Sequence, residues 1–229
     1  MIKTLKQNYI VIYATILSVL LLTLRIYATN TFTYTFLLWN LWLATIPLLI
    51  ALKVKQKEMK GWRLFFYSCL WLLFLPNAPY LITDILHISN LEGAPVWFDS
   101  LMLFTTAFIG LILAFQSMKI ISESWHYFWE TRWLIELPVV VQKRIGEMIK
   151  LVVFIMTGLG IYIGRVLRWN SWDIVSNYKG IFADIFNRIL HPFENAETWG
   201  FTFCYALAMW LMYNGWCKTF YEKRTDKSF

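Results

Sequence analysis

Residues 71–88 read WLLFLPNAPYLITDILHI, an apolar run that ends in two prolines, an aspartate and a histidine. Proline removes a backbone hydrogen-bond donor and disfavours helix in the residue before it. The stretch therefore predicts a helix that breaks or bends near Pro76 and Pro79. A short helix is then expected to begin at Thr83, a residue type that is favoured at helix N-termini. Broken helices at membrane depth occur where the freed backbone faces protein or a water-filled cavity.

The composition around this stretch is that of a membrane protein. The chain has 229 residues, of which 59% are hydrophobic and only 15% are charged, whereas soluble domains have about 25% charged residues. A helix that crosses the hydrocarbon core needs about 20 apolar residues. Six apolar segments can be placed, at residues 9–27, 32–52, 62–75, 96–115, 148–164 and 199–217. We expect an all-α, polytopic bundle of about six spans that forms a single domain over residues 1–229.

The positive charges are distributed as in a membrane protein. The net charge is +7, but the basic residues are not clustered with aromatic residues on a soluble module, so a nucleic-acid partner is not expected. Lysine and arginine concentrate in residues 53–63 and 218–227, and cytoplasmic loops carry such an excess. This predicts that both termini are cytoplasmic and that the connections 28–31, 83–95 and 165–198 lie outside.

The first segment follows two lysines, as a signal peptide would, but no small-residue cleavage site comes after it. We therefore expect a retained helix. The three cysteines, Cys69, Cys204 and Cys217, lie within or at the end of apolar segments without CxxC spacing, and we interpret them as small buried residues. No GxSxG, HExxH, P-loop or GxGxxG motif occurs in its required context.

Two segments fit the membrane surface better than its interior. Residues 117–147 contain several charges, and their tryptophans recur every fourth residue. This favours an interfacial helix or a cytoplasmic extension of the fourth span, and an extra crossing is the alternative. Apolar residues from Ile181 to Leu190 follow a helical period, which predicts an amphipathic helix on the outer surface that stops before Pro192.

Ionisable side chains gather at the expected outer ends of the spans. Asp84 and His87 are three residues apart, so they share a helix face. Such a pair can bind a divalent metal or act as an oriented general base. The alternative is that Asp84 stabilises a helix N-terminus and His87 is an interfacial residue. Asp99 lies within the outer part of the fourth span, where a carboxylate without a partner is costly.

Arg165 and Arg168, at the outer end of the fifth span, are the expected partners of Asp99. They share a helical face, and arginine suits bidentate contact with a carboxylate or a phosphate. Asp173 lies nearby in the chain. The alternative is a buried ion-pair network that locks the third, fourth and fifth spans together.

Two stretches, residues 71–88 and the sequence GRVLRWNSWD at 164–173, resemble the paired signatures of the bacterial domain of unknown function 1361 (DUF1361) family. The resemblance covers most of the chain in length and order. It implies a multi-spanning protein of the bacterial cell membrane and brings no activity with it.

The preferred interpretation is a pocket, open to the extracytoplasmic side, that accepts a polar or anionic group such as a lipid headgroup or a lipid-linked molecule. Asp84, His87 and Asp99 are the catalytic candidates for a general-base or metal-assisted reaction, with Asp84 and His87 as ligands of a divalent metal. The ligand-binding candidates are Asn77, Tyr80, Arg165, Arg168, Asn170 and Asp173. These residues fit a site that only binds a ligand as well as a site that also catalyses a reaction. The competing interpretations are a transporter, which would work as a homo-oligomer with the broken helix in its permeation path, and a structural or accessory subunit.

Overall fold

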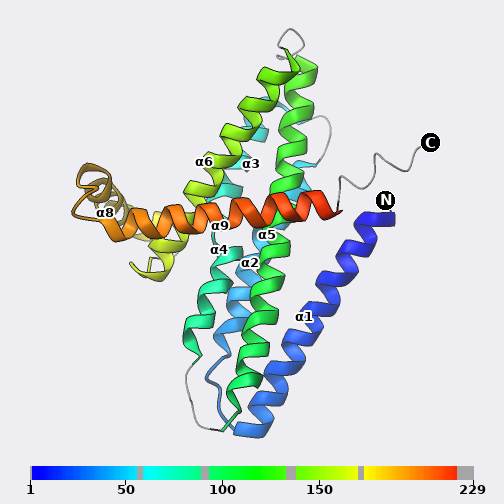
Figure 1. Ribbon diagram of the computed structural model, residues 1–229, viewed down its shortest axis with the longest axis vertical. Helices are drawn as coiled ribbons and strands as arrows, with labels where there is room; N and C mark the ends of the chain where they lie inside the picture. Colours follow the sequence, from blue (N-terminus) through cyan, green and yellow to red (C-terminus); the bar gives the residue numbers. More distant parts are fainter. Residues whose placement is uncertain (1, 56–58, 89–92, 133–137, 170–172, 221–229) are drawn as a thin grey trace. The chain divides into compact units, whose positions relative to one another are not determined.

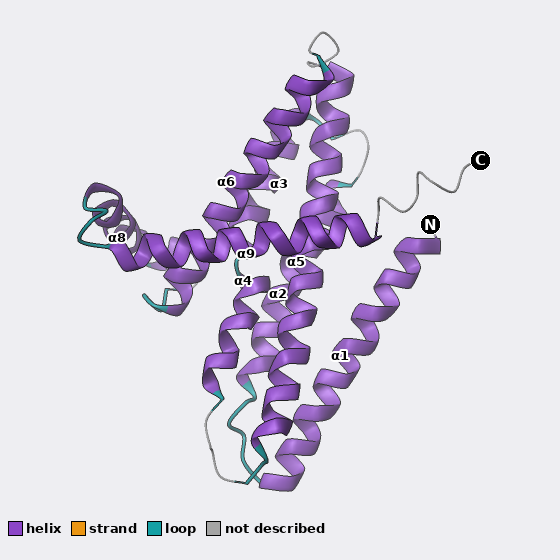
Figure 2. Cartoon of the chain, viewed as in Figure 1, coloured by secondary structure: helices purple, strands orange, loops and turns teal. Residues whose placement is uncertain are grey.

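The computed structural model describes residues 2–55, 59–88, 93–132, 138–169 and 173–220. Over these residues all regular structure is helical, which confirms the all-α class (Figure 2). The helices are α1 (Ile2–Thr29), α2 (Phe36–Val54), α3 (Gly61–Phe74), α4 (Asn77–Tyr80), the 3-10 helix η1 (Leu81–His87), α5 (Val96–Arg132), α6 (Val139–Arg165), α7 (Asp173–Ser176), α8 (Tyr178–Leu190) and α9 (Ala196–Phe220).

Several helices are long and apolar enough to cross a membrane, as expected for a multi-pass protein. Within the described residues there are five such segments, Tyr9–Thr29, Phe36–Val54, Gly61–His87, Val96–Thr131 and Val140–Arg165. The predicted sixth span forms α9, a helix of 25 residues, but α9 does not reach the same apolarity. The number of six spans therefore stays a prediction.

The chain divides into two compact units, residues 1–121 and 122–229, and α5 runs through the boundary. A single domain over 1–229 stays a prediction. In the first unit α2 packs against α3 and α4 (Figure 1). The indole of Trp71 in α3 donates a hydrogen bond to the hydroxyl of Ser117 in α5 at 3.0 Å. These contacts hold the broken helix beside α2 and α5.

Two close approaches of the backbone depend on glycine. A Cβ atom at Gly110 in α5 would overlap the carbonyl oxygen of Ala78 in α4. In the second unit α6 packs mainly against α9, and a Cβ atom at Gly158 would lie only 2.5 Å from the carbonyl oxygen of Thr202. Small residues let membrane helices approach closely, so both glycines serve packing.

The predicted break in the third span is confirmed, with one correction. α3 ends at Phe74, and helical structure resumes at Asn77 rather than at Thr83. Pro79 is compatible with this early start because the first N–H groups of a helix have no partner within it. Thr83 does not begin a helix but lies within η1. Its hydroxyl donates to the carbonyl of Tyr80 at 2.7 Å.

The region from residue 117 onward begins as an extension of the fourth span. α5 continues to Arg132, and the rings of Trp125 and Trp129 lie 5.4 Å apart on one face. Residues 133–137 lie outside the described residues. α8 ends at Leu190, as predicted.

Burial of the cysteines is the second correction. Cys69 and Cys204 are exposed on the surface of the protein. Lipid tails are as apolar as a protein core, so a helix in a bilayer can place a small apolar residue on its outer face at little cost.

Candidate functional site

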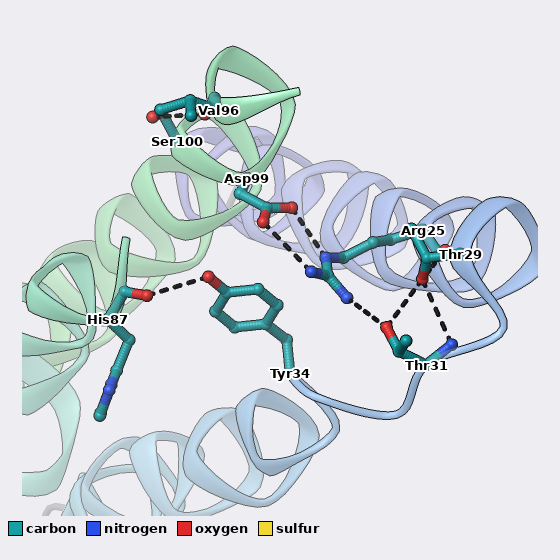
Figure 3. A network of polar contacts seen from close by, with 8 residues as sticks. All are labelled: Arg25, Thr29, Thr31, Tyr34, His87, Val96, Asp99 and Ser100. Atoms are coloured by element: carbon teal, nitrogen blue, oxygen red, sulfur yellow. Dashed lines mark hydrogen bonds and ion pairs between the residues drawn. The ribbon is translucent and has the colours of Figure 1, made fainter. Parts of the chain in front are cut away.

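A buried ion pair joins α1 to the start of α5 (Figure 3). Arg25 and Asp99 are each 1% exposed. The Arg25 Nε donates to Asp99 Oδ1 at 2.8 Å, and Nη2 donates to Oδ2 at 3.2 Å. Bidentate pairs of this kind are the strongest arginine–carboxylate contacts. Asp99 also lies in the first turn of α5, where a negative charge is favoured by the helix dipole.

The remaining faces of the Arg25 guanidinium are also used. Its Nη1 donates to the Thr31 hydroxyl at 3.0 Å, and its Cζ lies 4.4 Å from the centre of the Tyr34 ring. The Tyr34 hydroxyl donates to the carbonyl oxygen of His87 at 3.0 Å (Figure 3). The network therefore connects α1, the connection to α2, η1 and α5.

Tyr34 lies between the first two candidate spans and has a perturbed acidity. Burial raises the pKa of Tyr34 above its ordinary value of 10.0, and the negative charge of Asp99 raises this pKa further, while Arg25 lowers it. The neutral phenol is therefore the favoured form in the folded protein.

This geometry corrects the partner expected for Asp99. Arg25 forms the ion pair with Asp99, and the expected partners Arg165 and Arg168 belong to the second unit. The network joins the first span and η1, at the end of the third span, to the fourth span. A signal for Arg25 was present in the sequence, because a lone arginine in an apolar segment requires a carboxylate for the same reason that Asp99 requires a cation.

Asp84, in η1, makes a second polar contact, which involves α2. Its side chain is 1% exposed, and the amide of Asn40 donates to its Oδ2 at 3.0 Å. One turn later the exposed His87 places its ring 5.3 Å from the ring of Phe36. A 3-10 helix has about three residues per turn, so Asp84 and His87 lie above one another. Phe36 and Asn40 likewise share one face of α2.

The other candidates of the first motif lie just before Asp84. Asn77 and Tyr80 are half-buried in α4. The Asn77 amide donates to the carbonyl of Phe74 at 3.0 Å and so satisfies a backbone acceptor at the break. The broken helix therefore carries Asn77, Tyr80, Asp84 and His87 within three turns.

The second motif forms the end of α6 and the turn after it. α6 ends at Arg165, so Arg165 and Arg168 do not share a helical face as predicted. Arg168 is exposed and has a left-handed backbone with φ of 61°. The N–H of Trp169 returns to the carbonyl of Ile163 at 3.1 Å and closes the helix end. The left-handed backbone at Arg168 turns the chain away from the direction of α6.

Asp173 and Asn170 complete the predicted set. Asp173 begins α7 and accepts a hydrogen bond from the Ser176 hydroxyl at 3.1 Å, whereas Asn170 lies outside the described residues. The first motif belongs to the first unit and the second motif to the second unit. The predicted convergence of the two motifs stays a prediction.

Comparison with known proteins identifies the family. The model of the family described as "Protein of unknown function (DUF1361)" matches residues 39–212, which is well over half of the chain. The chain belongs to the DUF1361 family. No curated protein and no solved structure matches it.

The DUF1361 match contains both motifs, and with them Asp84, His87 and Asp99. Arg25 and Tyr34 precede the matched residues, so the buried ion pair connects the DUF1361 segment to the helix before it.

The metal-binding hypothesis rests on the pair Asp84 and His87. Among the described residues of this DUF1361 protein, no group of three or more His, Cys, Asp or Glu side chains is arranged to hold a metal ion. A divalent ion at Asp84 and His87 would therefore take its further ligands from water, from a bound molecule or from other oxygen donors.

Proposed function

We propose that this DUF1361 protein binds a polar or anionic group at the membrane edge through its first motif, and that the group is the headgroup of a phospholipid or of a lipid-linked molecule. One observation carries the proposal. Asp84 is a carboxylate of 1% exposure in the broken part of a membrane-spanning segment, one turn from the exposed His87. Ionisable residues within spans are rare and mark ligand or ion sites.

The two buried carboxylates have different surroundings. Both oxygens of Asp99 accept hydrogen bonds from Arg25, so its negative charge is balanced by a structural contact. Asp84 lies beside the neutral amide of Asn40 and one turn from an imidazole. Carboxylate, amide and imidazole together can accept from and donate to the hydroxyl, amine or phosphate groups of a lipid headgroup.

The second motif offers positive charge to an anionic headgroup. Arg168 is exposed in the turn that follows α6, and Arg165 lies at the end of that helix. Arginine binds phosphate with two parallel hydrogen bonds. The second motif is therefore a further candidate contact for the phosphate of a lipid.

The same residues would support catalysis if the bound molecule is transformed. The exposed imidazole of His87 is a candidate general base, and Asp84 can orient the attacking group or a metal ion beside it. Hydrolysis of a lipid-linked ester, or transfer of its polar group, is the reaction class that this arrangement favours.

The alternative of a structural or accessory subunit has one specific observation in its favour. The charge of Asp99 is used within the chain to fasten α1 to α5, which is the arrangement expected of a helix-locking contact. This arrangement accounts for the buried charge of Asp99.

Native mass spectrometry of the full-length protein tests the proposal. The protein is equilibrated with phosphatidylglycerol or with phosphatidylcholine in detergent, and retained lipid is counted. We expect the wild type to retain phospholipid, and the variants Asp84→Asn and Arg168→Ala to retain much less. Retention of phosphatidylglycerol alone would indicate recognition of an anionic headgroup, and retention of both lipids would indicate recognition of the shared phosphate.

Arg144→Ala is the matched control, because Arg144 is an exposed arginine near the opposite end of α6. It should leave retention unchanged. Equal retention in the wild type, Asp84→Asn and Arg168→Ala would contradict the proposal, and so would an equal loss in Arg144→Ala.

A further inference from the structure

α8 is fixed in orientation by side-chain contacts along one face. The indole of Trp169 donates to Asp184 Oδ2 at 2.8 Å, and the indole of Trp199 donates to the backbone carbonyl of Arg188 at 3.1 Å. Ile181, on the same side of the helix, is buried. The helix therefore cannot turn about its axis without losing two hydrogen bonds and a buried side chain.

A second face of α8 points away from these contacts and is strongly apolar. This face carries three aromatic residues at four-residue spacing, Tyr178, Phe182 and Phe186. Ile189 projects from the same side of the helix. Phe182 is 62% exposed and Phe186 is 63% exposed. Asn187, on the remaining face, is exposed and polar. α8 thus has one face that packs on protein, one apolar exposed face and one polar exposed face.

The position of α8 in the chain places it close to the end of a membrane span. The candidate span of α6 ends at Arg165, and Trp169 follows only four residues later. Four residues of extended chain reach at most about 14 Å. Since Trp169 is hydrogen-bonded to Asp184, the middle of α8 lies within reach of the level at which α6 leaves the hydrocarbon core.

A positive charge beside the apolar face of α8 also fits a position at the membrane surface. Lys179 is exposed and lies next to the direction of Phe186 on the helix surface. Helices that lie in a membrane interface have this arrangement, with aromatic and aliphatic side chains at the acyl boundary and lysine or arginine reaching the phosphates. Phe193, 95% exposed just after the helix, extends the apolar surface.

We propose that α8 lies flat in the bilayer surface at the end of α6, with Phe182 and Phe186 inserted at the acyl boundary and Lys179 at the level of the lipid phosphates. The bilayer is the occupant of this face because the face is continuous with the end of a membrane span and combines aromatic residues with a cation. The hydrogen bonds of Trp169 and Trp199 then act as the fastening that sets which face enters the lipid. This inference is independent of the ligand proposed for Asp84.

Spin labelling of the full-length protein in nanodiscs of phosphatidylglycerol and phosphatidylcholine tests this placement. Cys69, Cys204 and Cys217 are replaced by serine, and a nitroxide is attached to Phe186→Cys or, in a second protein, to Asn187→Cys. Power saturation then compares collisions with oxygen, which concentrates in lipid, and with a water-soluble nickel chelate. We expect oxygen to dominate at position 186 and the nickel chelate to dominate at position 187.

A third label at Phe182→Cys repeats the measurement one turn earlier, so the test does not depend on one variant that folds. Dominance of the nickel chelate at positions 182 and 186 would show that the face is in water and would overturn the proposal. Protection of both labels from both reagents would show that protein covers the face, such as a second copy of the chain, and would overturn it equally.

Discussion

The Arg25 guanidinium and the Asp99 carboxylate form a two-point ion pair between α1 and α5, with nitrogen–oxygen distances of 2.8 and 3.2 Å and no more than 1% of either residue exposed. Breaking a buried pair by removing one partner leaves an uncompensated charge and costs about 3–5 kcal/mol. We therefore expect Asp99→Ala and Arg25→Ala each to lower the free energy of unfolding by that amount, measured by reversible unfolding in mixed detergent micelles.

Two further variants make this prediction specific. The double variant Arg25→Met with Asp99→Leu removes both charges and should recover most of the lost stability. Lys150→Ala removes a partly exposed pair with Glu147 and should cost less than about 1 kcal/mol. Single variants at Arg25 and Asp99 that cost no more than Lys150→Ala would show that the pair does not hold the helices.

The raised pKa of Tyr34 predicts that the folded protein loses stability at alkaline pH. Its folded-state pKa is raised above 10.0 by burial and by Asp99. A group with a raised folded-state pKa contributes stability that is fully present below the unfolded pKa and is lost as the pH rises through the folded pKa. The wild type should therefore lose stability relative to Tyr34→Phe as the pH is raised above 10.0. Unfolding is measured in both proteins between about pH 8 and pH 11, a range that brackets the ordinary pKa of tyrosine. A difference in stability between the two proteins that stays constant over this range would contradict the prediction.

Gly110 and Gly146 predict opposite outcomes for the same substitution. Gly110→Ala would force the new methyl group against the carbonyl oxygen of Ala78, whereas Gly146→Ala meets open space. Alanine is favoured over glycine within a helix by about 1 kcal/mol. Thermal unfolding in detergent should give a lower Tm for Gly110→Ala and an unchanged or higher Tm for Gly146→Ala. A similar Tm for the two variants would mean that α5 and α4 are not in close contact.

The predicted orientation in the membrane can be checked by labelling whole cells. A cysteine-free protein carrying Asn177→Cys, just before α8, should react with an impermeant maleimide from outside the cell. The same protein carrying Lys55→Cys, in the lysine-rich connection after α2, should react only after the cells are opened. The reverse pattern would place both termini outside.

The positions of the helices could be read from the sequence to a large extent because long apolar segments have few other ways to satisfy their backbone in lipid. The break near Pro76 was predictable for the same reason, since proline leaves identifiable gaps in a helix. The helix start at Asn77 was missed because a threonine was favoured as the first residue, whereas the proline at the third position of the new helix was the better signal.

The candidate site was harder to predict because its contacts connect distant parts of the chain. Arg25 and Asp99 are 74 residues apart, and no spacing rule links them. Asn40 forms an interhelical hydrogen bond with Asp84, and nothing in the local sequence pointed to this pairing. The fold places an arginine beside Asp99 and the amide of Asn40 beside Asp84.

The central claim is the proposal that Asp84 belongs to a ligand site, whereas Asp99 belongs to the framework. The most direct test compares Asp84→Asn with Asp99→Asn in full-length protein, with retained phosphatidylglycerol and Tm measured on the same samples. We expect Asp84→Asn to lose the lipid while its Tm stays close to the wild-type value, and Asp99→Asn to show a much lower Tm. If lipid retention and Tm fall in step in both variants, the two carboxylates have the same structural role and the account is wrong.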